Sequence, residues 1–144
     1  MGDKNILIIE DDVDMVEANK IVLEANNYQV TTAYNTEDGY QAAEKMKPDL
    51  IMLDVMFGSK GETKGFELVR KIRMNKKLVS IPVLMVTAVN VENPGFHFSA
   101  NDGEYIPVDA FIDKPVQPDE LVKIAGELIE KKVSRWADWN KTNE

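Results

Sequence analysis

The chain has 144 residues, of which 44% are hydrophobic and 29% are charged. This length and composition predict one globular domain with its own hydrophobic core. The absence of cysteine and the presence of one histidine exclude disulfides, thiolate metal sites and hydrolases that need several imidazoles. The net charge of −8 argues against direct binding to nucleic acid, because contacts to phosphate groups require basic side chains.

The sequence predicts neither a secretion signal nor a membrane span. Residues 1–5 lack the charged and then apolar pattern of a signal peptide. No apolar run approaches the length of about 20 residues that a membrane helix needs. We therefore expect a cytoplasmic protein with no membrane partner.

Five short apolar runs predict buried β-strands. The first, third and fourth runs are continuously apolar, as expected for strands that are covered on both faces. The predicted strands are residues 6–9, 28–33, 50–53, 82–86 and 110–112.

Apolar residues that recur every three or four positions predict helices between these strands. The second helix is expected at residues 36–46, with Asn35 or Thr36 as its cap and Lys47-Pro48 at its end. The third is expected after Gly65. The first helix is defined by Met15, Ala18, Val22 and Ala25, and the third by Leu68, Val69 and Ile72. The last helix follows Pro118 and is defined by Leu121, Ile124, Ala125 and Leu128.

Strands that alternate with helices predict a parallel sheet with right-handed connections. Residues 90–107 interrupt the alternation, because they are rich in turn-forming residues and show no helical period. The helix expected between the fourth and fifth strands is therefore missing, shortened or displaced. Phe96, Phe98 and Tyr105 in this segment either cover the core or form a docking patch, and we assign no role to His97.

Polar residues follow the strands where ligands bind in an open α/β sheet, at the carboxyl ends. Glu10, Asp11 and Asp12 follow the first strand, and Asp54 ends the third. Clustered carboxylates repel one another unless a cation neutralises them, and a site built from oxygen ligands favours Mg²⁺. The fourth strand ends at Thr87 and the fifth is followed by Lys114.

This set of side chains suits phosphoryl transfer. An aspartate carboxylate can act as a nucleophile and carry a phosphoryl group. The transfer depends mainly on neutralising charge on the phosphoryl oxygens, which Mg²⁺ and the Lys114 ammonium would supply. The Thr87 hydroxyl could donate to a phosphoryl oxygen, and the small Ala88 leaves room for the group.

Four segments resemble the signature blocks of bacterial two-component receiver domains, and the resemblance covers about residues 5–130. The segments are Ile6 to Asp12, Leu53 to Met56, Val86 to Ala88 and Asp113 to Pro115. The resemblance implies a flavodoxin-like (βα)₅ fold, with a doubly wound, five-stranded parallel sheet in the order 2-1-3-4-5. It also implies that the chain takes a phosphoryl group from a histidine kinase or a histidine phosphotransfer protein.

The resemblance assigns roles to individual residues. Asp54 is the phosphoryl acceptor, and Thr87 and Lys114 contact the phosphoryl group. Thr87 and the aromatic Phe111 are the switch residues, while Asp12 starts the first helix. The implied metal ligands are Asp11, Asp54, Glu10 through water, and the backbone carbonyl of Met56.

The chain also departs from the family pattern. Gly58 stands where a proline is usual, and the glycine that normally follows corresponds to Gly65, after a longer loop of residues 59–64. This loop either gates the site or is a surface insertion. We expect a receiver domain at residues 1–133 and an extension at residues 134–144, whose Trp136 and Trp139 either pack on the domain or form an interaction edge.

The expected function is a phosphorylation-dependent switch with no attached output domain, which binds a downstream protein or passes the phosphoryl group onward. Such a domain catalyses only its own phosphorylation and dephosphorylation. Three alternatives remain: a pseudo-receiver that binds partners irrespective of phosphate, a phosphatase of the haloacid dehalogenase type, and a flavodoxin. The last two fit less well, because a dehalogenase-type nucleophile follows the first strand and because the acidic run after that strand would repel a flavin phosphate. Whether phosphorylation drives dimerisation is left open.

Overall fold

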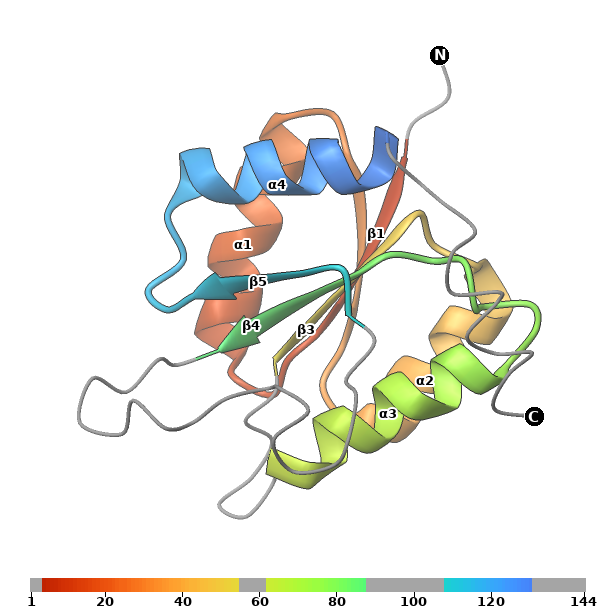
Figure 1. Cartoon of the computed structure of the whole chain (residues 1–144). Helices are drawn as coiled ribbons and strands as arrows, with labels where there is room; N and C mark the ends of the chain where they lie inside the picture. The colour runs from red at the N-terminus through yellow and green to blue at the C-terminus, as the bar shows by residue number, and fades with distance from the viewer. Residues whose placement is uncertain (1–3, 55–61, 88–107, 131–144) are drawn as a thin grey trace.

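The computed structural model describes residues 4–54, 62–87 and 108–130. Five parallel strands form one sheet in the order β2-β1-β3-β4-β5 (Figure 1). The predicted sheet, its direction and its strand order are confirmed. The strands are β1 (Asn5–Ile9), β2 (Gln29–Ala33), β3 (Leu50–Asp54), β4 (Val83–Thr87) and β5 (Ala110–Asp113).

The four described helices cover both faces of the sheet. α1 (Val13–Ala25) and α4 (Pro118–Glu130) lie on one face, and α2 (Thr36–Met46) and α3 (Glu62–Met74) lie on the other (Figure 1). None of these helices is long and apolar enough to cross a membrane. The prediction of a missing or displaced helix falls on residues 90–107, outside the described residues, and stays a prediction.

The three central strands are buried along almost their whole length, as their continuous apolar sequences predict. Alternate side chains point to opposite faces, so Leu7 and Ile9 pack toward α2 and α3, while Ile6 and Ile8 pack toward α1 and α4. In the β1–β3 register, Ile9 lies opposite Leu53. The residues that follow these two, Glu10 and Asp54, are both acidic. The register therefore brings them together at the carboxyl ends of β1 and β3, which we call the acidic edge.

Local side-chain chemistry explains where the first two helices begin and end. The Asp12 carboxylate caps α1 by accepting hydrogen bonds from the backbone N–H groups of Asp14 at 3.0 Å and Met15 at 3.3 Å. Asn35 caps α2, as one of the two predicted alternatives, and Lys47 ends it with a left-handed φ of 48°. The predicted role of Asp12 as the start of the first helix is confirmed.

The buried face of α1 lies one position away from the apolar residues that predicted the helix. Its buried residues are Val16, Asn19 and Leu23, whereas Met15 and Val22 are half-buried and Ala18 and Ala25 are exposed. The helix predicted from these apolar positions is confirmed, and a polar residue, Asn19, lies at the centre of its buried face.

The third helix begins earlier than predicted. α3 starts at Glu62, so the last residues of the expected loop and Gly65 itself belong to the helix. A glycine in a helix costs only about 1 kcal/mol relative to alanine. Burial of Leu68, Val69 and Ile72 against the sheet is sufficient to offset that cost.

Two helical glycines, Gly39 and Gly126, offer a matched test of packing. A Cβ atom at Gly39 in α2 would lie 2.6 Å from Cδ1 and 2.9 Å from Cγ1 of the buried Ile9, the residue before Glu10. At Gly126 in α4, the nearest atom would be the Tyr28 hydroxyl oxygen at 3.5 Å, an ordinary contact.

We therefore expect opposite effects of alanine at these two positions. Gly39→Ala should lower the free energy of unfolding by about 1 kcal/mol, because overpacking costs more than the gain in helix propensity. Gly126→Ala should raise it by roughly 0.5–1 kcal/mol through propensity alone. Urea unfolding monitored by circular dichroism measures both. Equal effects at the two positions would contradict the packing argument.

Candidate functional site

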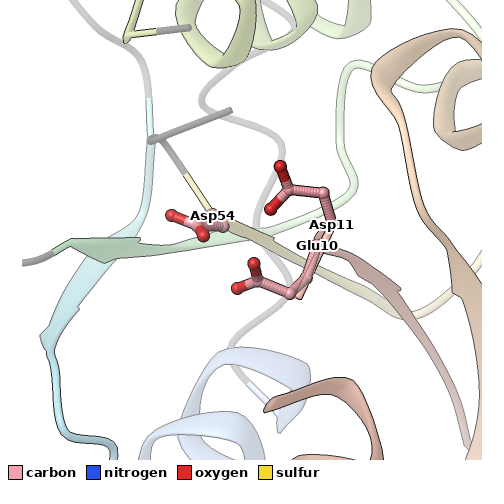
Figure 2. Close-up of side chains that lie close together, drawn as sticks. All are labelled: Glu10, Asp11 and Asp54. Carbon is pink, nitrogen blue, oxygen red and sulfur yellow. The ribbon is translucent and has the colours of Figure 1, made fainter. Parts of the chain in front are cut away.

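The site lies at the carboxyl ends of the central strands. Asp54 ends β3, and Glu10 and Asp11 follow β1, so three of the predicted residues meet at one edge of the sheet. Each of the three offers a carboxylate oxygen, and these oxygens all lie within 4.8 Å of one another. Figure 2 shows the three carboxylates converging from two chain segments. Glu10 and Asp54 are buried, with 4% and 3% of their surfaces exposed, whereas Asp11 is exposed.

Lys114 brings a positive charge to this cluster. It follows β5, two strands away from β3, and its Nζ donates a hydrogen bond to Asp54 Oδ2 at 3.0 Å. The lysine side chain is mostly covered and that of Asp54 is buried, so solvent screens this ion pair less than a surface pair. The carboxyl group of Asp54 thus lies in direct contact with the Lys114 side chain.

The electrostatics of Glu10 show how strained the acidic cluster is. Burial raises the pKa of Glu10 from 4.5 to about 8, and a side-chain hydrogen bond with Asp54 and the negative charge of Asp54 act in the same direction. The backbone N–H of Asp12, which donates to Glu10 Oε2 at 3.1 Å, and the charge of Lys114 oppose this shift of the pKa. A proton on Glu10 or a nearby cation would therefore relieve the repulsion within the cluster.

The donor set matches a hard divalent cation. All three clustered ligands are carboxylates, and neither a histidine nor a cysteine is present in the described ranges 4–54, 62–87 and 108–130. Mg²⁺ prefers oxygen ligands and commonly uses one or two carboxylates together with water. The residues present therefore fit the ion that the sequence predicts.

The other predicted site residues are placed less completely. Thr87 ends β4 and pairs with Asp113 of β5, next to Lys114 in the chain, so its backbone lies at the same edge of the sheet. Phe111 lies in β5 and is 40% exposed. Met56, Gly58 and Ala88 lie outside the described residues, as do the aromatic residues of 90–107 and 134–144 that the sequence singled out.

Comparisons with known proteins identify the family. The family model for the response regulator receiver domain matches residues 6–126 of the chain. The chain therefore belongs to the receiver domains of two-component response regulators.

Two curated relatives and one solved structure illustrate the match. The chain is 34% identical over 122 residues to the phosphate regulon transcriptional regulatory protein PhoB of Pseudomonas aeruginosa, covering 85% of this chain and 50% of PhoB. It is 34% identical to the alkaline phosphatase synthesis transcriptional regulatory protein PhoP of Bacillus subtilis, covering 82% of this chain and 45% of PhoP. A CheY-like receiver domain from Methanospirillum hungatei superposes with a TM-score of 0.72 and 30% identity, over 91% of this chain and 97% of that one.

The match concerns a part of the curated relatives. The chain spans about half the length of PhoB and PhoP. The shared part is the receiver domain, whereas the names of PhoB and PhoP describe proteins about twice as long as this shared part.

The sequence reading missed one polar residue close to the site. Asn19 of α1 is buried and lines a pocket together with Lys114. Its signal in the sequence is an amide side chain at a position where the helical period of Val16 and Leu23 requires a buried residue.

Proposed function

We propose that Asp54 accepts a phosphoryl group and that the phosphorylated domain switches the binding of a downstream protein. The observation that carries this proposal is the contact of 3.0 Å between Lys114 Nζ and Asp54 Oδ2, beside the carboxylates of Glu10 and Asp11. A nucleophile, a fixed positive charge and a cation site are thereby combined in one place, as phosphoryl transfer requires. Membership of the receiver family supports the same reading.

The donor is a phosphohistidine of a histidine kinase or a histidine phosphotransfer protein. A carboxylate oxygen of Asp54 forms a bond to phosphorus as the bond from phosphorus to the histidine nitrogen breaks, and the released imidazole takes a proton from solvent. The Lys114 ammonium stays beside the transferred group and compensates its charge, while the Thr87 hydroxyl donates to a phosphoryl oxygen. The chain thus catalyses its own modification and the later hydrolysis, without turnover of a separate substrate.

The cation held at this site is Mg²⁺. Asp11 and Asp54 would bind it directly, Glu10 would hold it through water, and the Met56 carbonyl would complete the protein ligands. When bound, it supplies positive charge to the phosphoryl oxygens and removes the mutual repulsion of the carboxylates.

The output of the switch is a change at Thr87 and Phe111. Phe111 lies in β5, one strand beyond Thr87, and 40% of its surface is exposed, so an inward turn of the ring would change the surface of the domain. Such a two-state movement would alter the surface that a downstream protein, or a second phosphorylated copy, recognises. With a net charge of −8, residues 1–133 act through protein contacts in the cytoplasm and do not bind nucleic acid directly.

Phosphorylation in vitro tests the assignment of Asp54. Incubation with acetyl phosphate and Mg²⁺ should add one phosphoryl group to the protein, measured by intact mass. Asp54→Ala should abolish the addition, because no other carboxylate is paired with Lys114 in the described residues. Asp119→Ala, which removes an exposed carboxylate at the start of α4, should leave it unchanged.

The same experiment separates the proposal from a pseudo-receiver that acts irrespective of phosphate. A wild-type protein that is folded by circular dichroism but gains no mass from acetyl phosphate would support the pseudo-receiver. Phosphorylation that persists in Asp54→Ala would place the acceptor elsewhere and contradict the assignment. The assembled acidic cluster with its lysine favours the phosphorylated receiver.

A further inference from the structure

Asn19 is a buried polar residue that the fold does not require. It lies on the sheet-facing side of α1 between Val16 and Leu23, and 7% of its surface is exposed. In the described part of the chain, its carboxamide forms no hydrogen bond. A buried amide destabilises a protein unless water or a ligand supplies the hydrogen bonds that the chain does not.

The side chain of Asn19 lines a pocket of about 440 Å³ between α1 and the segment that follows β5. α1 contributes Met15 and Ala18 to this pocket, and the other wall is formed by Lys114, Pro115 and Val116. The volume lies within the range of small-molecule sites, which are typically mostly apolar with a few polar groups that orient the ligand. Here the apolar walls come from both segments, and the amide comes from Asn19.

We propose that this pocket binds a small, neutral and mostly apolar molecule that carries one amide-like group. The Asn19 carboxamide has both a donor and an acceptor, so its best complement is a group that also offers both, such as an amide or a lactam. A ligand anion is disfavoured, since Lys114 is the cationic residue in the described lining and its ammonium already binds Asp54. Lys114 lines this pocket and also binds Asp54, so the pocket adjoins the acidic cluster, but the proposed contact at Asn19 uses none of the three clustered carboxylates.

The cost of Asn19 to stability supports a binding role. Leucine has the same branching as asparagine and would fill the same space without a buried amide. Asn19→Leu should therefore raise the melting temperature, by roughly 3–6 °C. Residues that serve binding often lower stability. A polar residue that lowers stability and faces a pocket is therefore expected to serve binding.

Titration of the uniformly ¹⁵N-labelled chain with benzamide, followed by two-dimensional NMR, tests the proposal. Benzamide should shift the side-chain NH₂ signals of Asn19, with an affinity of about 1 mM, as expected for a fragment of this size. Methyl benzoate has a similar shape but no N–H donor, and it should bind at least fivefold more weakly. No phosphodonor is present, so the outcome does not depend on whether Asp54 can accept a phosphoryl group.

Variants of α1 provide the controls. Asn19→Leu should weaken benzamide binding at least tenfold. Ala18→Leu, at an exposed residue of the lining, should block the pocket and does not alter the core. Glu17→Leu adds the same side chain to an exposed position outside the lining and should leave binding unchanged.

Three results would overturn the proposal. The first is the absence of any shift at Asn19 with saturating benzamide, which would leave only water as the partner of the amide. The second is equal binding of benzamide and methyl benzoate, and the third is undiminished binding to Ala18→Leu. If Asn19→Leu does not fold, the Ala18→Leu and Glu17→Leu pair still decides the location of the site.

Discussion

Replacing Arg73 with methionine is expected to lower the free energy of unfolding by about 3–5 kcal/mol. The Arg73 side chain is fully buried at the end of α3. Its guanidinium group donates to the carbonyl oxygens of Val79 at 3.0 Å and Ile81 at 2.7 Å, and it pairs with Asp109 Oδ2 at 2.9 Å. Methionine keeps much of the packing volume but leaves a buried carboxylate and two carbonyl groups without this donor.

The position of this ion pair explains why the loss should be large. Asp109 Oδ2 also accepts a hydrogen bond from the backbone N–H of Val83 at 2.9 Å. One cluster thus joins the end of α3, the start of β4 and the residue before β5. β5 is a short strand at the edge of the sheet, and its other end leads to Lys114, which binds Asp54. The Arg73–Asp109 pair therefore anchors the strand that carries the lysine of the site.

Urea unfolding of four variants, the two single variants Arg73→Met and Asp109→Leu, their double variant and Lys77→Ala, measures this effect. Lys77→Ala removes an exposed cation from the connection between α3 and β4, and it should change the free energy of unfolding by less than about 0.5 kcal/mol. The double variant Arg73→Met with Asp109→Leu should lose less than the sum of the two single variants, because it leaves no unpaired buried charge. A loss below about 1 kcal/mol for Arg73→Met would contradict the predicted anchoring role.

The fold was largely predictable because its strands have a simple chemical signature. The runs at residues 6–9, 50–53 and 82–86 are continuously apolar, which is typical of strands that are buried between two layers. Two features that the sequence did not predict involve buried polar residues. Asn19 lies at the centre of the buried face of α1, and the periodicity gave no sign that Arg73 would be buried. Its partner Asp109 is 36 residues away in the chain, so only the tertiary structure reveals the pair.

The candidate site was predictable for a different reason. Ligands of parallel sheets bind at the carboxyl ends of the strands, so Glu10, Asp11, Asp54 and Lys114 could be grouped before any distance was known. The sequence could not predict the electrostatics of the group. The raised pKa of Glu10 depends on its burial and on its contact with Asp54, and both are products of the packed structure.

The raised pKa of Glu10 predicts how stability depends on pH and on Mg²⁺. The pKa is about 8 in the folded protein, compared with an ordinary value of 4.5, so the folded state without a cation holds this proton more tightly than the unfolded chain does. The stability that the proton contributes is present in full below pH 4.5 and is lost as the pH rises toward 8. In EDTA, the melting temperature of the wild type should therefore fall between pH 6 and pH 8.5. Added Mg²⁺ should raise the melting temperature more at pH 8.5 than at pH 6.

Glu10→Gln separates the effect of the Glu10 carboxyl group on stability from its effect on Mg²⁺ binding. Glutamine is neutral at every pH, so the variant in EDTA should be more stable than the wild type at pH 8.5 and nearly equal to it at pH 5. It should bind Mg²⁺ about 10–100-fold more weakly, because a neutral amide holds a coordinated water less well than a carboxylate does. Thermal unfolding and Mg²⁺ titration at both pH values measure this, with Glu17→Gln, an exposed residue of α1, as the control. If Glu10→Gln loses stability in EDTA at pH 8.5, the glutamate is not under strain. The acidic edge would then be a stable carboxylate cluster that has no need of a cation.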